Sequence, residues 1–486
     1  MSCYPSFPSK QALVINSPFI EPHRPPISCA IVAEVFRQQG YQVQVLDLNI
    51  ELYHSLGLDD FYRCQTNYTF DVPTEVQAAD VQKVFDHFLT ADLSCYEFIA
   101  ISCFSYYNVS MTRKICEQIR QHTCSKIIAG GPGIEADNFG QKLYQEKLVD
   151  YYIVGEGELA LIDVINGRTG PGINGQPAEQ IADIENLPLP NYGYFDLARY
   201  DQLLDAPDVF IYGSRGCVRR CTFCDIQHYW PKFRWRTGKS IADEMIGNYE
   251  KYGIRYFYFA DSLVNGNLKE FRQFTERLAS YKENLFRWSG YAIVRPRGQH
   301  SRDFFDVVGA AGAMQWNIGV ETGVDRIRTE MQKKFTNDDV DWHLEQSQRI
   351  GLTNLFLMMP TWHTETAEEH QEYLKIFTRW KNYAADGTIM GLNLSYTVEM
   401  LDQAPIGQKA GIEYDYDHAV GARYQKIAWI SRNRPELTHY EKFRRTLAIY
   451  EEAIRHNWPI NNRLHKAREL KGTISNFLTE LQKSNS

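Results

Sequence analysis

Residues 209–224 read VFIYGSRGCVRRCTFC, a short apolar run that leads directly into three closely spaced cysteines. The run Val209–Gly213 predicts a buried strand, which places Cys217, Cys221 and Cys224 on the loop that follows it. Three thiolates on one short loop can bind three irons of a cubane cluster and leave the fourth iron open. An open iron can bind a small molecule, so the spacing indicates a reactive cluster.

Zinc binding and simple burial are the alternatives to a cluster for these three cysteines. A structural zinc site needs four protein ligands, usually as two pairs, and His228 is the nearest fourth candidate. Its spacing from the cysteines is unusual for a zinc ribbon. The thiols could also be unrelated buried side chains, as free cysteines often are. We favour an open-site iron–sulfur cluster, because unrelated cysteines rarely fall so close together.

The composition is that of a globular protein of two to four domains. The chain has 486 residues, a net charge of -8, 44% hydrophobic residues and 23% charged residues. The acidic balance argues against binding to nucleic acids. The segment Gln227–Arg236 mixes aromatic and basic residues, and we interpret it as a cover over the cluster or a contact for an anionic substrate.

The sequence also predicts a cytoplasmic protein with no membrane partner. No apolar run approaches the ~20 residues that span a bilayer, and the N-terminus lacks the layout of a signal peptide. None of the ten cysteines follows Cys224, which is unlike a secreted disulfide framework and fits a reducing compartment.

Residues 1–165 alternate strand-like and helix-like patterns, which is typical of a doubly wound, Rossmann-like α/β domain. The candidate strands are Ala12–Ser17, Tyr41–Leu48, Phe98–Cys103, Lys126–Ala129 and Tyr151–Val154. The candidate helices between them are Ile27–Gln39, Thr74–Leu93 and Met111–Gln121. Ligands of such domains bind beyond the carboxyl ends of the strands, where this chain has glycine-rich turns. Tight turns account for these glycines equally well.

The remaining chain divides into three parts. Residues 166–208 lose the periodicity and read as an interdomain linker. Residues 209–400 resume it and predict a partial (β/α)6 barrel with the strands Val209–Gly213, Tyr256–Ala260, Phe286–Ala292, Gln315–Gly319, Asn354–Met359 and Gly391–Tyr396. Residues 401–486 predict a helical region, with Tyr440–His456 and Leu464–Gln482 as its clearest helices.

The C-x3-C-x2-C loop, with an aromatic residue before its last cysteine, resembles the signature of the radical S-adenosylmethionine (SAM) superfamily. In that family the cysteines ligate a [4Fe-4S] cluster, SAM binds the open iron, and one electron cleaves SAM to a 5′-deoxyadenosyl radical. The resemblance implies that Cys217, Cys221 and Cys224 are the metal ligands and that Phe223 belongs to the cofactor site.

Two later segments, Tyr256–Ser262 and Gly319–Gly323, resemble the cobalamin-dependent branch of that superfamily. The resemblance implies that Asp261 and Glu321, each at a strand end, bind SAM, with a structural ion pair as the alternative for both. Arg295 is a further candidate for the SAM carboxylate, and a plain ion pair is equally compatible with the sequence.

One motif of the branch is altered. The branch usually shows Pro-Gly-Glu-Thr, whereas residues 360–366 read PTWHTET, which replaces the glycine by bulkier residues. Thr366 also begins a capping box, so helix initiation accounts for much of this segment. His363 is either a substrate-facing acid or base or an ordinary polar loop residue.

Residues 1–165 resemble the cobalamin-binding domain that precedes the barrel in this branch. The resemblance lies in Gly130-Gly131-Pro132, in Val154–Glu158 and in the Leu187–Pro190 linker. The D-x-H-x-x-G motif, whose histidine ligates cobalt in other cobalamin proteins, is absent. The resemblance implies a cofactor site near Tyr106, Tyr107, Gly130, Gly131 and Gly155. Plain packing is the alternative for the two tyrosines.

Together these features predict a radical SAM enzyme, most plausibly a cobalamin-dependent methyltransferase that acts on an unactivated carbon. A radical rearrangement, cyclisation or oxidation is the alternative, and a non-catalytic iron–sulfur or cobalamin sensor is a more distant one. The resemblance implies a small-molecule or peptide substrate and an electron donor such as flavodoxin or ferredoxin.

Overall fold

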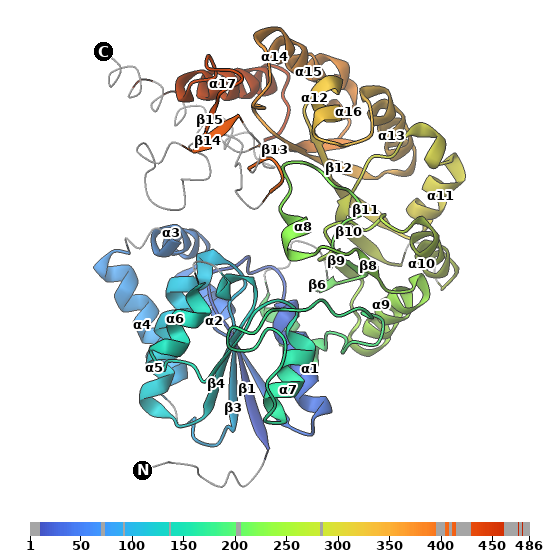
Figure 1. Cartoon of the computed structure of the whole chain (residues 1–486). Helices are drawn as coiled ribbons and strands as arrows, with labels where there is room; N and C mark the ends of the chain where they lie inside the picture. The colour runs from blue at the N-terminus through green and yellow to red at the C-terminus, as the bar shows by residue number, and fades with distance from the viewer. Residues whose placement is uncertain are drawn as a thin grey trace. The chain divides into compact units, whose positions relative to one another are not determined.

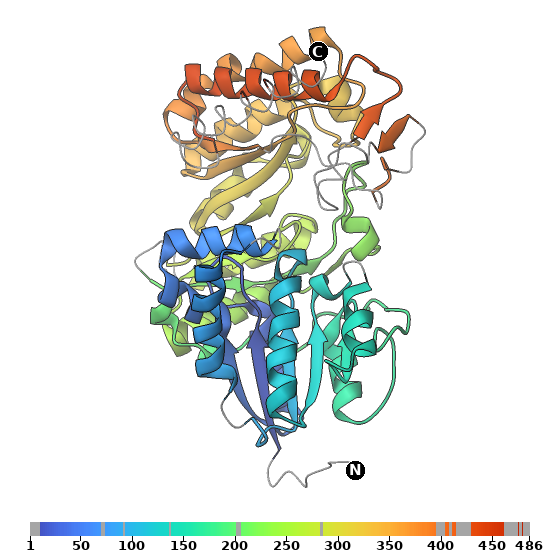
Figure 2. The same ribbon diagram turned by 90° about the vertical axis from the view of Figure 1, so that its left-hand side faces the viewer.

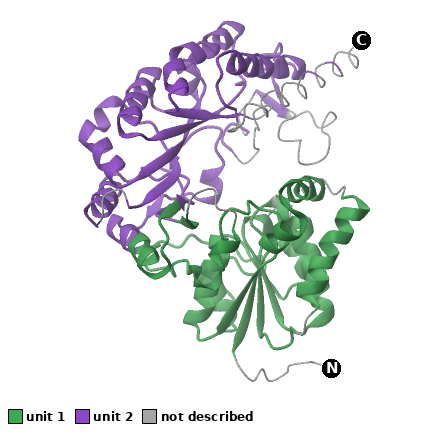
Figure 3. Ribbon diagram, turned by 180° about the vertical axis from the view of Figure 1, so that it is seen from behind, with its two compact units in different colours: residues 1–211, 244–257 green, residues 212–243, 258–486 purple. Residues whose placement is uncertain are grey.

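The computed structural model describes residues 10–69, 73–90, 93–135, 138–200, 206–281, 285–394, 404–407, 411–414, 429–460, 475 and 479. The chain forms two compact units, residues 1–211 with 244–257 and residues 212–243 with 258–486 (Figure 3). No helix among the described residues is both long and apolar enough to cross a membrane. The four domain boundaries drawn from the sequence stay predictions.

The first unit contains a five-stranded parallel sheet with the order β2-β1-β3-β4-β5. Its strands are β1 Gln11–Asn16, β2 Gln42–Asp47, β3 Phe98–Ser102, β4 Lys126–Gly130 and β5 Tyr151–Ile153. Its helices are α1 Ile27–Gln38, α2 Leu48–Leu56, α3 Leu58–Thr69, α4 Glu75–Leu89, α5 Val109–His122, α6 Phe139–Gln145 and α7 Gly157–Ile165. The doubly wound fold and all five predicted strands are confirmed.

The two faces of this sheet are covered by different helices (Figures 1 and 2). Helices α1 and α7 pack on one face together with Ala12 and Val14 of β1. Helices α4 and α5 pack on the other face together with Leu13 and Ile15. Alternate residues of β1 therefore serve opposite cores, as the period of a strand requires. The order of the strands reverses between β1 and β3, which is where ligands of such sheets bind.

The predicted barrel region, from residue 208 onward, forms a six-stranded sheet with the order β13-β12-β11-β10-β9-β6. These strands are β6 Asp208–Ile211, β9 Tyr256–Phe259, β10 Arg287–Ala292, β11 Ala313–Glu321, β12 Thr353–Met358 and β13 Ile389–Leu394. The helices of this part are α8 Ile226–Tyr229, α9 Gly238–Tyr252, α10 Leu268–Tyr281, α11 Arg302–Ala310, α12 Asp325–Glu330, α13 Asn337–Ile350, α14 Ala367–Leu374, α15 Ile376–Arg379, α16 Lys381–Ala385 and α17 His439–Arg455. All six predicted strands are confirmed.

Two short antiparallel pairs were not predicted. β7 Ser214–Arg215 pairs with β8 Arg234–Trp235, and β14 Ile412–Tyr414 pairs with β15 Trp429–Ser431. Strands of two or three residues are too short to show a hydrophobic period. The predicted helix Tyr440–His456 is confirmed as α17, whereas Leu464–Gln482 lies almost wholly outside the described residues.

Two histidines lie in the hydrophobic core between α11, α13 and β11. The ring of His343 stacks on Trp316 with centroids 5.7 Å apart, and its Nε2 lies 2.9 Å from Asn354 Oδ1. Burial lowers the pKa of His343 to about 4 and that of His300 to about 3, because a charged imidazole loses its hydration there.

These buried histidines predict a loss of stability in mild acid. Between about pH 6.5 and about pH 4 the unfolded chain binds a proton at His343 and the folded chain does not, so acidification favours unfolding. The fall in the free energy of unfolding should be smaller in His343→Gln, by up to about 3 kcal/mol. Urea unfolding followed by circular dichroism at several pH values measures it. The exposed control His87→Gln should match the wild type, and an unchanged pH profile in His343→Gln would contradict the prediction.

Candidate functional site

The three cysteines lie on the loop between β7 and α8, within the second unit. All three are free thiols, and the backbone N–H of Arg219 donates to Cys217 Sγ over 3.4 Å. No three His, Cys, Asp or Glu side chains among the described residues converge closely enough to hold a single metal ion. A cubane cluster binds one thiolate at each of three irons, so it fits thiols that are spread along a loop.

The backbone of this loop is held at two positions, Gly216 before the first cysteine and Thr222 after the second. Gly216 has a φ of +86°, and a Cβ there would lie 3.0 Å from Lys232 O, so only glycine fits easily. The N–H of Thr222 donates to Met331 O over 3.2 Å, and its carbonyl accepts from Ile406 N over 2.7 Å. The peptide between the second and third cysteines is therefore held from two distant parts of the chain.

Burial raises the pKa of all three thiols, and that of Cys224 reaches about 12. The ammonium group of Lys333 acts in the opposite direction on Cys217 and Cys221, because a nearby positive charge stabilises a thiolate. Metal binding to these thiols must therefore release protons, and Lys333 favours that release.

The structure brings the predicted residues Glu321 and Phe223 together through Lys333, which follows the Gly319–Gly323 segment in the sequence. Lys333 Nζ lies 2.6 Å from Glu321 Oε1 and 5.2 Å from the centroid of the Phe223 ring. Glu321 ends β11 in a left-handed conformation with a φ of +68°. The loop after it is held by the fully buried guanidinium of Arg328, which donates to the carbonyls of Val320 and Thr322.

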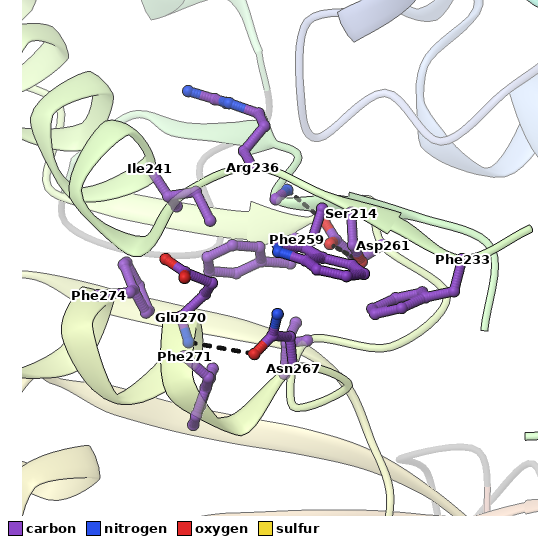
Figure 4. A pocket seen from close by; sticks show the side chains of 13 residues that line it. Ser214, Phe233, Arg236, Ile241, Phe259, Asp261, Asn267, Glu270, Phe271 and Phe274 are labelled. Atoms are coloured by element: carbon purple, nitrogen blue, oxygen red, sulfur yellow. Dashed lines mark hydrogen bonds between the residues drawn. The ribbon is translucent and has the colours of Figure 1, made fainter. Parts of the chain in front are cut away.

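Asp261 follows β9 and is bound by the chain itself (Figure 4). Its carboxylate accepts from the N–H of Gly213 over 2.8 Å and from Ser214 Oγ over 2.5 Å. Burial raises the pKa of Asp261 to about 7, and these hydrogen bonds oppose that rise. The carboxylate lies in a pocket whose other walls include Phe259 and Phe271, and it fixes the turn that leads into the cysteine loop.

Arg295, in the loop after β10, has a guanidinium with spare donors. It donates to the carbonyls of Asn265 over 2.6 Å and Gly266 over 3.0 Å. Burial lowers its pKa to about 10, and Arg219 adds to that effect. No carboxylate among the described residues pairs with it, and its Nε is buried without a partner. An unpaired, half-buried guanidinium suits an anionic ligand.

The altered motif at residues 360–366 lies beside the cysteine loop. The ring of Trp362 meets Phe223 edge-on with centroids 6.3 Å apart. Thr366 begins α14 with a capping box, as the sequence suggested. His363 is buried, and its Nε2 lies 3.1 Å from Glu330 Oε1, so a carboxylate of the chain itself lies beside one of its ring nitrogens.

The aromatic and basic segment after the cysteines stacks on itself. The guanidinium groups of Arg215 and Arg234 lie 5.9 and 5.5 Å from the centroid of Trp230. Trp235 stacks on Phe233 with centroids 5.6 Å apart. These internal contacts account for the alternation of the two residue types there.

The carboxyl edge of the first unit's sheet has two kinds of glycine. A Cβ on Gly130 would meet nothing within 4 Å, so this position faces open space. Gly131 and Gly155 have φ values of +104° and +82°, and Gly131 packs against the backbone of Cys103. The turn geometry requires these last two glycines.

Aromatic side chains lie exposed at the same edge, after β3. Tyr107 is 41% exposed, and Phe104, which the sequence analysis missed, is 55% exposed. The side chain of Tyr106 lies outside what the structure describes. Behind them, Asp47 accepts from Asn16 Nδ2 over 2.7 Å and from Tyr200 Oη over 2.9 Å. The exposed rings of Phe104 and Tyr107 form a surface that suits a large, partly apolar ligand.

Comparisons with known proteins support this organisation. Residues 211–377 match the radical SAM superfamily. Cytidylyl-2-hydroxyethylphosphonate methyltransferase of Streptomyces wedmorensis is 22% identical over 381 residues, which cover 67% of each chain. The anaerobic magnesium-protoporphyrin IX monomethyl ester cyclase of Synechocystis sp. is 27% identical over 345 residues, which cover 64% of this chain and 65% of the cyclase. The similarity thus spans about two thirds of these relatives.

Two solved structures share the fold over most of the chain. The radical SAM methyltransferase TsrM from Kitasatospora setae, solved with cobalamin and a [4Fe-4S] cluster, has a TM-score of 0.63 at 16% identity and covers 92% of this chain and 89% of its own. The cobalamin-dependent enzyme OxsB, solved with aqua-cobalamin, has a TM-score of 0.63 at 14% identity, with coverages of 93% and 72%. Residues 211–377 are therefore identified as a radical SAM domain within this chain.

Proposed function

We propose that this chain is a cobalamin-dependent radical SAM methyltransferase. The observation that carries the proposal is the fixed loop with Cys217, Cys221 and Cys224 inside the radical SAM domain. The fold shared with TsrM and OxsB supports it over nearly the whole chain. As a prediction from sequence, the protein works in the cytoplasm with a flavodoxin or ferredoxin as electron donor.

In this proposal each cysteine ligates one iron of a [4Fe-4S] cluster, and the chain's own residues hold SAM. When bound, the cluster supplies an electron that cleaves SAM to a hydrogen-abstracting radical, and cobalamin carries the methyl group that is transferred. Arg295 binds the carboxylate of SAM with its spare donors, and Phe223 packs against the cofactor. Asp261 acts on the cofactors indirectly, because the hydrogen bonds that it accepts from Gly213 and Ser214 position the cysteine loop.

Cobalamin would bind at the carboxyl edge of the first unit's sheet. The reversal of strand order between β1 and β3, the open space at Gly130 and the exposed rings of Phe104 and Tyr107 all support this placement. The chain lacks the histidine motif that ligates cobalt in other cobalamin proteins, so we propose binding without that ligand.

The substrate and the fate of the substrate radical are the finer part of the proposal. We propose methyl transfer to an unactivated carbon of a small molecule or peptide. The similarity to the magnesium-protoporphyrin ester cyclase favours a second candidate, in which the same radical begins an oxidative cyclisation. The two candidates differ in whether a methyl group leaves SAM.

The first test is the iron content of protein reconstituted anaerobically with iron and sulfide. The wild type should retain about four irons per chain after desalting, as a cubane cluster requires. Replacement of Cys217, Cys221 or Cys224 by Ala should remove most of the iron and the visible absorbance of the cluster. Cys124→Ala, at an exposed cysteine of the first unit, is the control and should retain iron like the wild type. Iron retention by the three variants would reject the cluster assignment.

A second test concerns cobalamin. Gly130→Leu fills the open space at the carboxyl edge, so it should lower cobalamin retention on a desalting column at least about tenfold, an effect of about 1.4 kcal/mol. Gly247→Leu also places its side chain in open space, but on α9, and should retain cobalamin normally. Equal retention by both variants and the wild type would place cobalamin elsewhere.

The third test follows the products of SAM without a known substrate. Reduced, reconstituted protein should convert SAM to 5′-deoxyadenosine slowly, because uncoupled cleavage needs only the cluster and an electron. With methyl-labelled SAM and hydroxocobalamin, label should enter cobalamin in the wild type and not in Gly130→Leu. Deoxyadenosine formation without any labelled cobalamin would favour the cyclisation candidate over methyl transfer.

A further inference from the structure

Lys333 is a buried ammonium group beside the cysteine loop, and no step described above uses it. Only 10% of its side chain is exposed. It donates to Glu321 Oε1 over 2.6 Å and to the carbonyl of Gly319 over 3.0 Å. Its Nζ lies 5.2 Å from the centroid of the Phe223 ring, and Phe223 stands between Cys221 and Cys224 in the sequence.

The backbone around Lys333 is bent in a way that aims its side chain at the loop. Gln332 and Lys334, on either side, both have left-handed φ values, of +62° and +58°. Residues other than glycine rarely adopt this backbone conformation, so it costs free energy at each of the two positions. Directly before Gln332, the carbonyl of Met331 accepts the hydrogen bond from the N–H of Thr222, which ties the turn to the cysteine loop.

Strand β11, which carries Gly319 and Glu321, is locally irregular and leaves room for the ion pair. A Cβ on Gly319 would lie 2.6 Å from Lys333 Nζ and closer still to Glu321 Oε1. The pairing of β11 with β12 shifts register between Gly319 and Glu321, and Glu321 itself has a φ of +68°. Five local irregularities, at Gly319, at Glu321, in the register between them, at Gln332 and at Lys334, therefore surround a single buried salt bridge, which is itself costly to desolvate.

Lys333 lies beside the cysteine loop, because its Nζ is 5.2 Å from the centroid of the Phe223 ring, and Phe223 stands between Cys221 and Cys224 in the sequence. Burial disfavours the charge of Lys333, but Glu321 and the thiols outweigh burial and keep its pKa above the usual value. Lys333 is therefore a fixed cation at neutral pH, held in place by its ion pair with Glu321.

We propose that Lys333 sets the reduction potential of the cluster held by Cys217, Cys221 and Cys224. This inference rests on the proposed function, because it assumes that a [4Fe-4S] cluster forms there. The cluster gains one negative charge when an external one-electron donor reduces it. A fixed cation in a low-dielectric site stabilises the more negative form, so Lys333 makes the potential less negative and the reduction easier.

The test is a redox titration of the reconstituted full-length protein without SAM, followed by electron paramagnetic resonance. Lys333→Met should shift the midpoint potential to more negative values. Lys334→Met, an exposed neighbour with the same substitution, is the matched control and should titrate like the wild type. Lys333→Arg keeps the charge and should restore most of the potential.

A second variant separates charge from structural damage. Glu321→Gln removes the counter-charge and leaves Lys333 in place, so it should shift the potential in the opposite direction, to less negative values. This test holds even where Lys333→Met fails to retain iron. Shifts of the same sign in both variants, or a wild-type potential in Lys333→Met with weaker SAM binding, would overturn the inference and make Lys333 a SAM ligand or a structural residue. Absence of a cluster in the wild type would instead refute the proposed function.

Discussion

The hydrogen bonds of the Thr222 peptide are the constraint on which the candidate site depends. The cysteine loop has only two residues of sheet before it, β7, and a four-residue helix after it, so it has little regular structure of its own. The N–H of Thr222 donates to the carbonyl of Met331, directly after α12, and the carbonyl of Thr222 accepts from the N–H of Ile406, far along the chain. The geometry of the three thiols is thus set by the folded barrel rather than by the local sequence.

Acidic side chains around this loop are bound within the chain before any cofactor arrives. Asp261 is bound by the loop that precedes the cysteines, and Glu321 is bound by Lys333. A buried carboxylate without partners would be too costly to keep, so each of these groups rigidifies the site whether or not it also touches a ligand. Arg295 differs, since its guanidinium keeps unused donors. Arg295 is therefore the residue of this group that can bind an additional anion.

The fold was largely predictable from sequence, and the site only in part. Each of the eleven predicted strands is apolar and bounded by turn residues, so the hydrophobic period was enough to find them. The cysteines stood out because their spacing is local. The role of Lys333 could not be predicted in that way, since it arises from two left-handed residues beside it and from a contact with Phe223, which is more than a hundred positions away. Phe104 was equally invisible, because exposure of an apolar ring is a property of the folded edge.

The two units differ in what they leave unsatisfied at their ligand-binding ends. In the first, the buried carboxylate of Asp47 accepts a hydrogen bond from Asn16, and aromatic rings are left exposed at the carboxyl edge. In the second, apolar rings such as Trp288 and Trp316 are buried, and what is left over is charge and thiols. An exposed apolar surface gains free energy by covering a large ring system, whereas unpaired cations and thiols gain it by binding anions and metal. This division fits the proposed function, in which cobalamin binds to the first unit and a [4Fe-4S] cluster and SAM bind to the second.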